Sequence, residues 1–96
     1  MHTGPAQAHP LEQPIAAFLA DLAQANHSTH TRRAYAADLK QFAAWYAGPL
    51  DAITAGTLRD FFITLAHLRP ATRARKQAAL TRFLTWAYGT PFRHGG

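Results

Sequence analysis

The sequence predicts an all-α protein that folds as a compact bundle of four helices. Apolar residues recur at helical spacing in four separate segments, and residues typical of helix ends stand between these segments. No convincing run of alternating polar and apolar residues indicates a strand. Alanine, the best helix former, fills many positions, and 96 residues suffice for one domain with one core. A large internal active site is therefore not expected.

The first helix is expected over about residues 14–25. Pro14 suits an opening turn, because the N–H that proline lacks would have no intrahelical partner there. Asn26 is suited to the left-handed conformation that often ends a helix. One face of this helix is apolar, at positions i, i+3, i+4 and i+7: Ile15, Phe18, Leu19 and Leu22.

The second helix is expected over about residues 28–46. The Ser28 hydroxyl can accept a hydrogen bond from the backbone N–H of Thr31, which is the usual way to cap a helix start. Gly48 and Pro49 follow its end. Its predicted buried stripe consists of Tyr35, Leu39, Phe42 and Tyr46.

The third helix is expected over about residues 54–68, with Thr54 at its start. Ile53 and Leu58 are spaced to pack across this start as a hydrophobic staple. Pro70 limits how far the helix can run. The predicted inner face comprises Leu58, Phe61, Phe62 and Leu65.

The fourth helix is expected over about residues 70–88, because Pro70 also suits a first turn. Its apolar positions are Leu80, Phe83, Leu84 and Ala87. Outside the four helices, residues 1–13 and 89–96 contain glycine, proline and scattered polar residues without a period. They are predicted to be a flexible lead-in and a flexible tail.

The composition also limits the compartment and the chemistry. No stretch is apolar for long enough to span a bilayer, and the N-terminus lacks the layout of a secretory signal, so a cytoplasmic protein without membrane contact is expected. The absence of cysteine excludes disulfides, thiolate nucleophiles and cysteine-bound zinc. Stability is therefore expected to come from packing, without a cofactor.

Basic residues outnumber acidic ones by ten to five, and Asp60 is the last acidic residue along the chain. Six basic residues follow it. A surface of this kind favours a polyanion as partner, because lysine and arginine docked on phosphates release condensed counterions. A basic surface that only serves solubility is the alternative explanation of the charge alone.

Two segments carry a family resemblance. Residues 28–45 contain the pattern S-x-x-T-x-x-x-Y-x-x-D-L-x-x-F-x-x-W, and residues 71–87 contain A-T-x-x-R-x-x-A-A-L-x-x-F-x-x-W-A. Together with the segment 53–65 between them, they resemble in order and spacing the N-terminal core-binding domain of tyrosine recombinases, the phage integrase family. The resemblance spans about residues 15–88.

The resemblance implies a four-helix, SAM-like DNA-binding domain over residues 14–88. Such a domain forms one arm of a C-shaped clamp, with its second and fourth helices in or beside the major groove of double-stranded DNA. It also implies that a separate C-terminal catalytic domain, toward which residues 89–96 would lead, supplies the tyrosine nucleophile. The expected partners are thus duplex DNA, that catalytic domain and other recombinase protomers, and the chain by itself is not expected to be an enzyme.

Two features depart from the family pattern. The link between the third and fourth helices is shorter than usual, which could tilt the fourth helix. Gly56 stands early in the third helix where an acidic residue is common, which should weaken the cap of that helix.

Seven of the ten basic residues fall on the second and fourth helices. Arg75 and Arg82 are seven residues apart and so share a helix face, with the small residues Ala78 and Ala79 between them. One or two of the arginines are expected to contact base edges and the others phosphates. The predicted DNA-binding set, with short polar residues at the helix starts, is Thr29, His30, Arg32, Arg33, Lys40, Thr72, Arg73, Arg75, Lys76 and Arg82.

Other chemistry is not favoured. Tyr35 lies on the apolar stripe and is predicted to be a core residue, as are Trp45 and Trp86. His27 and His30 are the most suggestive of six histidines, but no cysteine or carboxylate cluster accompanies them, so no metal site is expected. Asp38 and Asp60 are interpreted as isolated carboxylates without an acid–base partner.

Two alternatives to DNA binding belong to other classes. A SAM-like bundle could be a protein-interaction module, and exposed tryptophan or phenylalanine on a helix face would favour that interpretation. An intact small enzyme is not supported, because the sequence contains no catalytic cluster.

Overall fold

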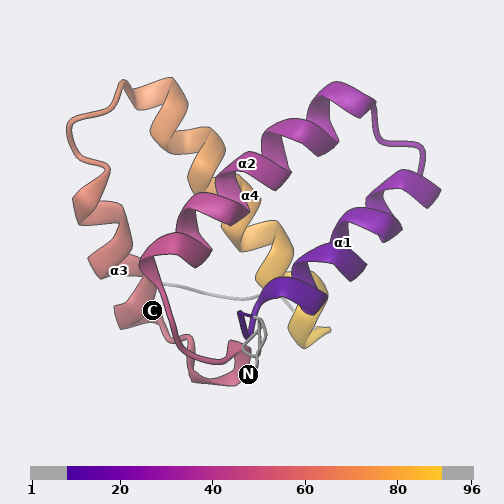
Figure 1. Ribbon diagram of the computed structural model, residues 1–96. Helices are drawn as coiled ribbons and strands as arrows, with labels where there is room; N and C mark the ends of the chain where they lie inside the picture. The colour runs from indigo at the N-terminus through magenta and orange to yellow at the C-terminus, as the bar shows by residue number, and fades with distance from the viewer. Residues whose placement is uncertain (1–8, 90–96) are drawn as a thin grey trace, which may run out of the picture.

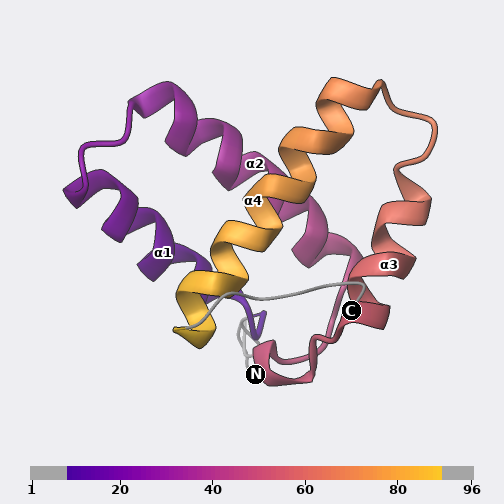
Figure 2. The ribbon, with the colours of Figure 1, turned by 180° about the vertical axis from the view of Figure 1, so that it is seen from behind.

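Two helix hairpins form the fold, and the second helix of one hairpin crosses the second helix of the other at the centre of the molecule (Figure 1; from behind in Figure 2). The computed structural model describes residues 9–89. No strand occurs among these residues, so the predicted all-α, four-helix fold is confirmed. The helices are α1 (Glu12–Gln24), α2 (Thr29–Trp45), α3 (Ala55–Thr64) and α4 (Pro70–Tyr88), with a short 3-10 turn η1 (Leu50–Ala52) before α3.

The start of α1 differs from the sequence expectation, because the helix begins at Glu12 and not at Pro14. Leu11 at its N-cap is fully buried, which anchors this start in the core. The ring of His9 lies against the end of α2, with Nε2 2.8 Å from both the Ala43 and the Tyr46 carbonyl oxygens. Part of the predicted lead-in therefore packs on the bundle, and residues 1–8 and 90–96 lie outside the described residues.

The turn between α1 and α2 agrees with the prediction. Asn26 has a positive φ of 64°, and the N–H groups of Asn26 and His27 donate to the carbonyls of Ala23 and Leu22. This pair of bonds is a Schellman motif, which satisfies carbonyl groups that the helix end leaves unpaired. The predicted Ser28 cap is also present, with its hydroxyl 3.0 Å from the N–H of Thr31.

The start of α3 is capped more strongly than the sequence suggested. Thr54 and Thr57 form a reciprocal capping box, in which each hydroxyl accepts from the other residue's N–H. The predicted staple residues Ile53 and Leu58 are both buried. The helix start therefore keeps a complete cap in spite of Gly56. Glycine is still the least suitable helix residue after proline.

We expect Gly56→Ala to stabilise the protein by about 0.5–1 kcal/mol, because alanine loses less backbone entropy on folding. A Cβ at this position would meet only the Thr54 hydroxyl, at an ordinary contact distance of 3.6 Å. Urea unfolding followed by circular dichroism measures the change. Gly48→Ala is the opposite control, since its Cβ would lie 2.7 Å from the Tyr46 phenol oxygen; a destabilised Gly56→Ala variant would contradict the expectation.

The end of α3 corrects the predicted boundary at about residue 68, because the helix stops at Thr64. The backbone N–H groups of Leu65, Ala66 and Leu68 then donate to carbonyls three residues back, as in a 3-10 turn, and not four residues back as in an α-helix. These turns let Leu65 be buried and Leu68 pack against the core. Arg69 must be extended before Pro70, with ψ 148°, so the chain has to leave the helix before it.

The core is built from apolar side chains of all four α-helices. At its centre the rings of Phe18 and Phe83 meet edge to face at 5.5 Å, and those of Phe42 and Phe61 at 5.1 Å. The fully buried large side chains are Phe18, Phe42, Phe83, Leu11, Leu39, Leu58, Leu80 and Leu84, together with one charged residue, Asp38.

The aromatic predictions hold in two of three cases. Tyr35 and Trp86 both pack against the core, in contact with the Phe18 ring. The indole N–H of Trp86 also donates to the Asp21 carboxylate at 2.6 Å, which ties α4 to α1. Trp45 contacts the Phe61 ring but is 43% exposed, so it is only partly a packing residue. None of the described helices combines the length and the hydropathy needed to cross a membrane.

Candidate nucleic-acid interface

The two helices with most of the basic residues are joined at their crossing by an ion-pair cluster around one buried carboxylate. The Asp38 carboxylate of α2 accepts from Nε and Nη2 of Arg75, at 3.0 and 2.9 Å, and from Nζ of Lys76 at 2.9 Å. Lys76 also donates to Gln41 Oε1 at 2.6 Å. We call these four residues, Asp38, Gln41, Arg75 and Lys76, the crossing cluster.

Asp38 is the residue that the sequence interpretation missed. It is only 2% exposed, and the expectation that it is isolated is wrong. An unpaired buried carboxylate would be very unfavourable, so the three hydrogen bonds are what allow it to be buried. A signal was present in the sequence: Asp38 is three residues after Tyr35 and four before Phe42, which places it on the buried stripe of its own helix.

The ion pair leaves Arg75 able to bind a further group. Asp38 raises the pKa of Arg75, first by hydrogen bonding and then by Coulombic attraction, so the guanidinium stays charged. The Arg75 side chain is 49% exposed, whereas that of Lys76 is 13% exposed. Lys76 is therefore mainly a structural partner of Asp38, and Arg75 is the cation of this cluster that solvent and ligands can reach.

A second group of polar residues lies at the turn between α1 and α2. Arg32 donates from Nε to the His27 carbonyl at 3.3 Å and from Nη2 to the Thr29 hydroxyl at 3.2 Å. Arg82 of α4 approaches the same turn, with Nη2 3.5 Å from His27 Nε2. Three predicted site residues, Thr29, Arg32 and Arg82, are thus brought together around His27. A cation beside the His27 ring does not favour a metal there.

Two predicted cations are exposed on the side of α2 that borders α1. Arg33 and Lys40 are exposed and seven residues apart on one helix face. Neither makes a hydrogen bond or ion pair with another residue of the described range 9–89. His30 is exposed on the first turn of α2, and Thr72 is half-buried on the first turn of α4.

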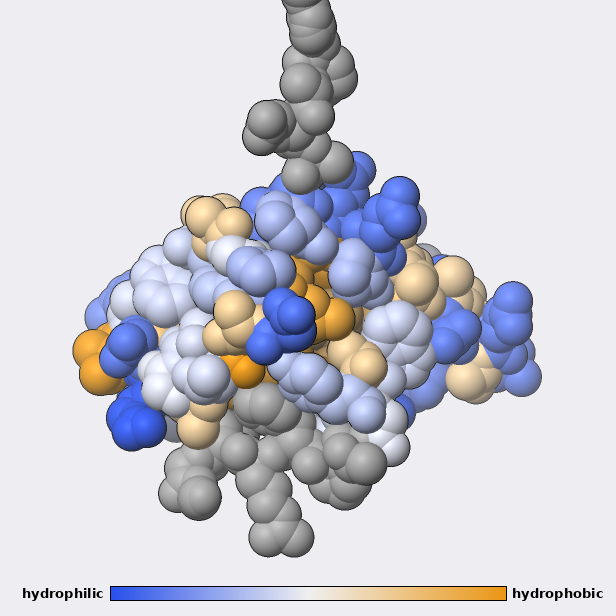
Figure 3. Space-filling model, turned by 90° about the horizontal axis from the view of Figure 1, so that it is seen from below, coloured by the Kyte–Doolittle hydropathy of each residue, from blue (hydrophilic) through white to orange (hydrophobic). Residues whose placement is uncertain are grey.

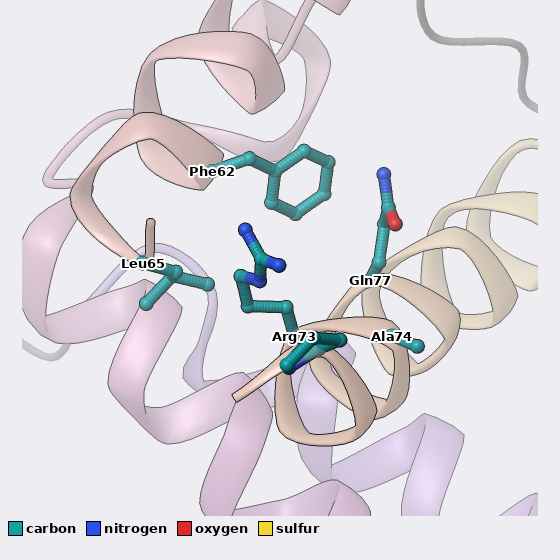
Figure 4. Close-up of a pocket in the computed structure, with 6 residues that line it drawn as sticks. Phe62, Leu65, Arg73, Ala74 and Gln77 are labelled. Carbon is teal, nitrogen blue, oxygen red and sulfur yellow. The ribbon is translucent and has the colours of Figure 1, made fainter. Parts of the chain in front are cut away.

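Arg73 lies apart from the other predicted residues. It lines a hollow of about 270 Å³ between α3 and α4, together with Phe62, Leu65 and Gln77. Figure 4 shows its side chain extending from α4 toward the Phe62 ring of α3. Two helix positions separate it from Arg75, which places the two side chains on different sides of α4.

The predicted small-residue strip of α4 is correct for one alanine and wrong for the other. Ala78 is exposed between Arg75 and Arg82, but Ala79 is fully buried. The reason is helical geometry, since Ala79 is one position before Leu80 and four before Phe83, both of which face the core.

Residues 15–90 match the family model described as phage integrase, N-terminal SAM-like domain. Over 69 residues the chain is 39% identical to proteins named tyrosine recombinase XerC from Mycobacterium bovis and Mycobacterium tuberculosis. The match covers 67% of this chain and 23% of each relative, so the chain corresponds to about a quarter of their length. No solved structure matches the chain significantly.

Proposed function

This chain belongs to the phage integrase N-terminal SAM-like domain family, and on that basis we propose that it binds double-stranded DNA as the core-binding arm of a site-specific tyrosine recombinase. In this proposal α2 and α4 face the major groove. A separate C-terminal domain of the parent protein performs the catalysis, and other protomers join it on paired DNA sites in the cytoplasm.

The observation that best supports this proposal is the direct packing of the two basic helices against each other. The crossing cluster connects α2 with α4, so cations on the two helices are held at a defined separation. Arg33 and Lys40 supply exposed charge on the side of α2 that borders α1, and Arg75 supplies reachable charge on α4, where Asp38 holds it at another side of α2. A rigid pair of helices with such charges suits the regular phosphate spacing of a duplex.

The proposal predicts that Arg33→Glu weakens binding to a fluorescently labelled mixed-sequence duplex by roughly tenfold at about 0.1 M salt, because a phosphate contact becomes a repulsion. Fluorescence anisotropy measures the affinity over a series of salt concentrations. Arg33→Ala should lower the slope of log affinity against log salt by about one, the value for one lost phosphate contact.

Arg59→Glu is the matched control, since it makes the same change of charge on an exposed residue of α3. It is expected to weaken binding by less than about twofold, because the screening length is only about 10 Å at moderate salt. Equal losses for the two variants would mean that total charge alone drives binding, and the α2 face would then be ruled out as the interface.

A protein-interaction module remains the second candidate, because three large hydrophobic side chains of the described residues are exposed: Trp45, Ile63 and Tyr88. Trp45 is 43% and Ile63 66% exposed, and a further apolar hollow lies between α1 and α2 beside Ile15 and Leu19. Figure 3 shows apolar residues at the centre of the face seen from below, with polar residues around them. Analytical ultracentrifugation over a wide concentration range tests this candidate: self-association without duplex binding would favour it.

A further inference from the structure

We propose that Asp38 is a positioning residue for DNA contact: it holds the Arg75 guanidinium by one edge, so that the other edge is presented to a pair of acceptor atoms on the duplex. The acceptors are either two phosphate oxygens or O6 and N7 of one guanine, which offer the same paired geometry. This inference rests on the proposed function. It assigns a DNA-binding role to a negatively charged residue, which DNA by itself would repel.

The geometry of the ion pair leaves one edge of the guanidinium available. Asp38 bonds to Nε and Nη2, which form the side edge of the group. A guanidinium has five N–H donors in a fixed plane, and these two bonds leave the donors on Nη1 and the second donor on Nη2. Two of these three free donors, one on Nη1 and one on Nη2, lie along the end edge, and they form a second fork of the kind that binds paired acceptors.

The two partners differ in burial, which leaves Arg75 open to a ligand. The Asp38 side chain is 1% exposed, whereas that of Arg75 is 49% exposed. Solvent therefore reaches Arg75 but not the carboxylate that it binds. No other residue of the described range hydrogen-bonds to Arg75, so the end edge has no partner within this part of the chain.

The local charge remains favourable for a polyanion. Arg75 and Lys76 together carry two positive charges against one negative charge on Asp38. Lys76 thus compensates the carboxylate, and one net positive charge is left on the reachable side. Because Asp38 already restricts the rotamers of Arg75, less side-chain freedom is lost when DNA binds. Lys40 and Arg33, which have no such support, would have to be ordered on binding.

The test uses the sign of the effect of Asp38→Asn on affinity for a labelled mixed-sequence duplex. Charge alone predicts tighter binding, because the substitution removes a negative charge near the DNA. Positioning predicts weaker binding by about threefold to tenfold, the usual effect of releasing one long side chain. Tighter or unchanged binding by a folded Asp38→Asn variant would overturn the proposal.

Arg75→Lys provides a second variant that keeps the charge and retains a partner for Asp38, but has no second edge. We expect its affinity to fall about tenfold, and circular dichroism should show an unchanged helix content. In the Arg75→Lys background, Asp38→Asn should cause no additional loss. Should Asp38→Asn fail to fold, Arg75→Lys alone decides, and unchanged affinity would refute the positioning role. An equal loss from Asp38→Asn in both backgrounds would show that Asp38 acts only through the fold.

The two acceptor sources are separated with a duplex in which 7-deazaguanine replaces guanine, so that N7 is missing. If Arg75 contacts guanine, the unsubstituted chain loses affinity on this duplex and the Arg75→Lys chain does not. If it contacts phosphate, each chain binds the two duplexes with equal affinity, and Arg75→Lys remains about tenfold weaker than the unsubstituted chain on both. If the unsubstituted chain binds no duplex at low salt, the proposed function itself is refuted. If it binds and both variants bind equally well, only the role of Asp38 is refuted.

Discussion

Phe42→Ala is expected to lower the free energy of unfolding by about 3–5 kcal/mol, the usual range for a buried phenylalanine. Phe42 is fully buried. The centroid of its ring lies 5.1 Å from that of Phe61 in α3 and 5.4 Å from that of Tyr46. Alanine would leave a cavity between α2 and α3 and would remove these ring contacts. Because small domains are stable by only about 5–15 kcal/mol, the loss is a large part of the total.

Guanidinium unfolding monitored by circular dichroism measures this loss. Trp45→Ala is the matched control, since it removes a larger ring from the same helix at a position that is 43% exposed. It should cost clearly less than Phe42→Ala, because part of the ring is in water already in the folded protein. Equal losses would contradict the assignment of Phe42 to the centre of the core.

Asp38→Ala is expected to destabilise the protein by about 3 kcal/mol, because it leaves the Lys76 ammonium and the Arg75 guanidinium without their counter-charge. Lys76 is the main source of this loss, since only 13% of its side chain is exposed. The Arg75 part is smaller, because that side chain is half in solvent. The measurement is thermal and urea unfolding at two salt concentrations.

Asp60→Ala is the control, since Asp60 is an exposed carboxylate on α3. Surface substitutions of this kind usually change stability by less than about 0.5 kcal/mol. The part of the difference that comes from the largely buried Lys76–Asp38 pair should persist at high salt, because salt screens such a pair only weakly. If Asp38→Ala were as stable as Asp60→Ala, the crossing cluster would not hold α2 and α4 together.

Most helix positions could be predicted from local patterns. Ser28 and Asn26 were recognised because caps and left-handed turns depend on residues only a few positions apart. The staple of Ile53 and Leu58 is local for the same reason. The end of α3 was missed because Leu65 continues the helical period, although burial of both Leu65 and Leu68 requires the chain to turn there.

The candidate site could be predicted only in part. Counting charges identified α2 and α4 as the basic helices, and helical spacing placed Arg33 and Lys40 on the side of α2 away from Tyr35 and Leu39. It could not show that Arg73 extends toward α3, because that depends on which side of α4 packs against which neighbour. The approach of Arg82 to His27 likewise joins residues 55 positions apart.

The sequence alone determined the helix content, the caps, the apolar stripes and the family pattern, because each depends on residues that are close together along the chain. Only the tertiary structure decided which cations are free. Asp38 and Arg75 are 37 residues apart, and they meet because α2 crosses α4 at this point. A buried carboxylate then needs a cation, and the partner it acquires is set by the crossing of the two helices.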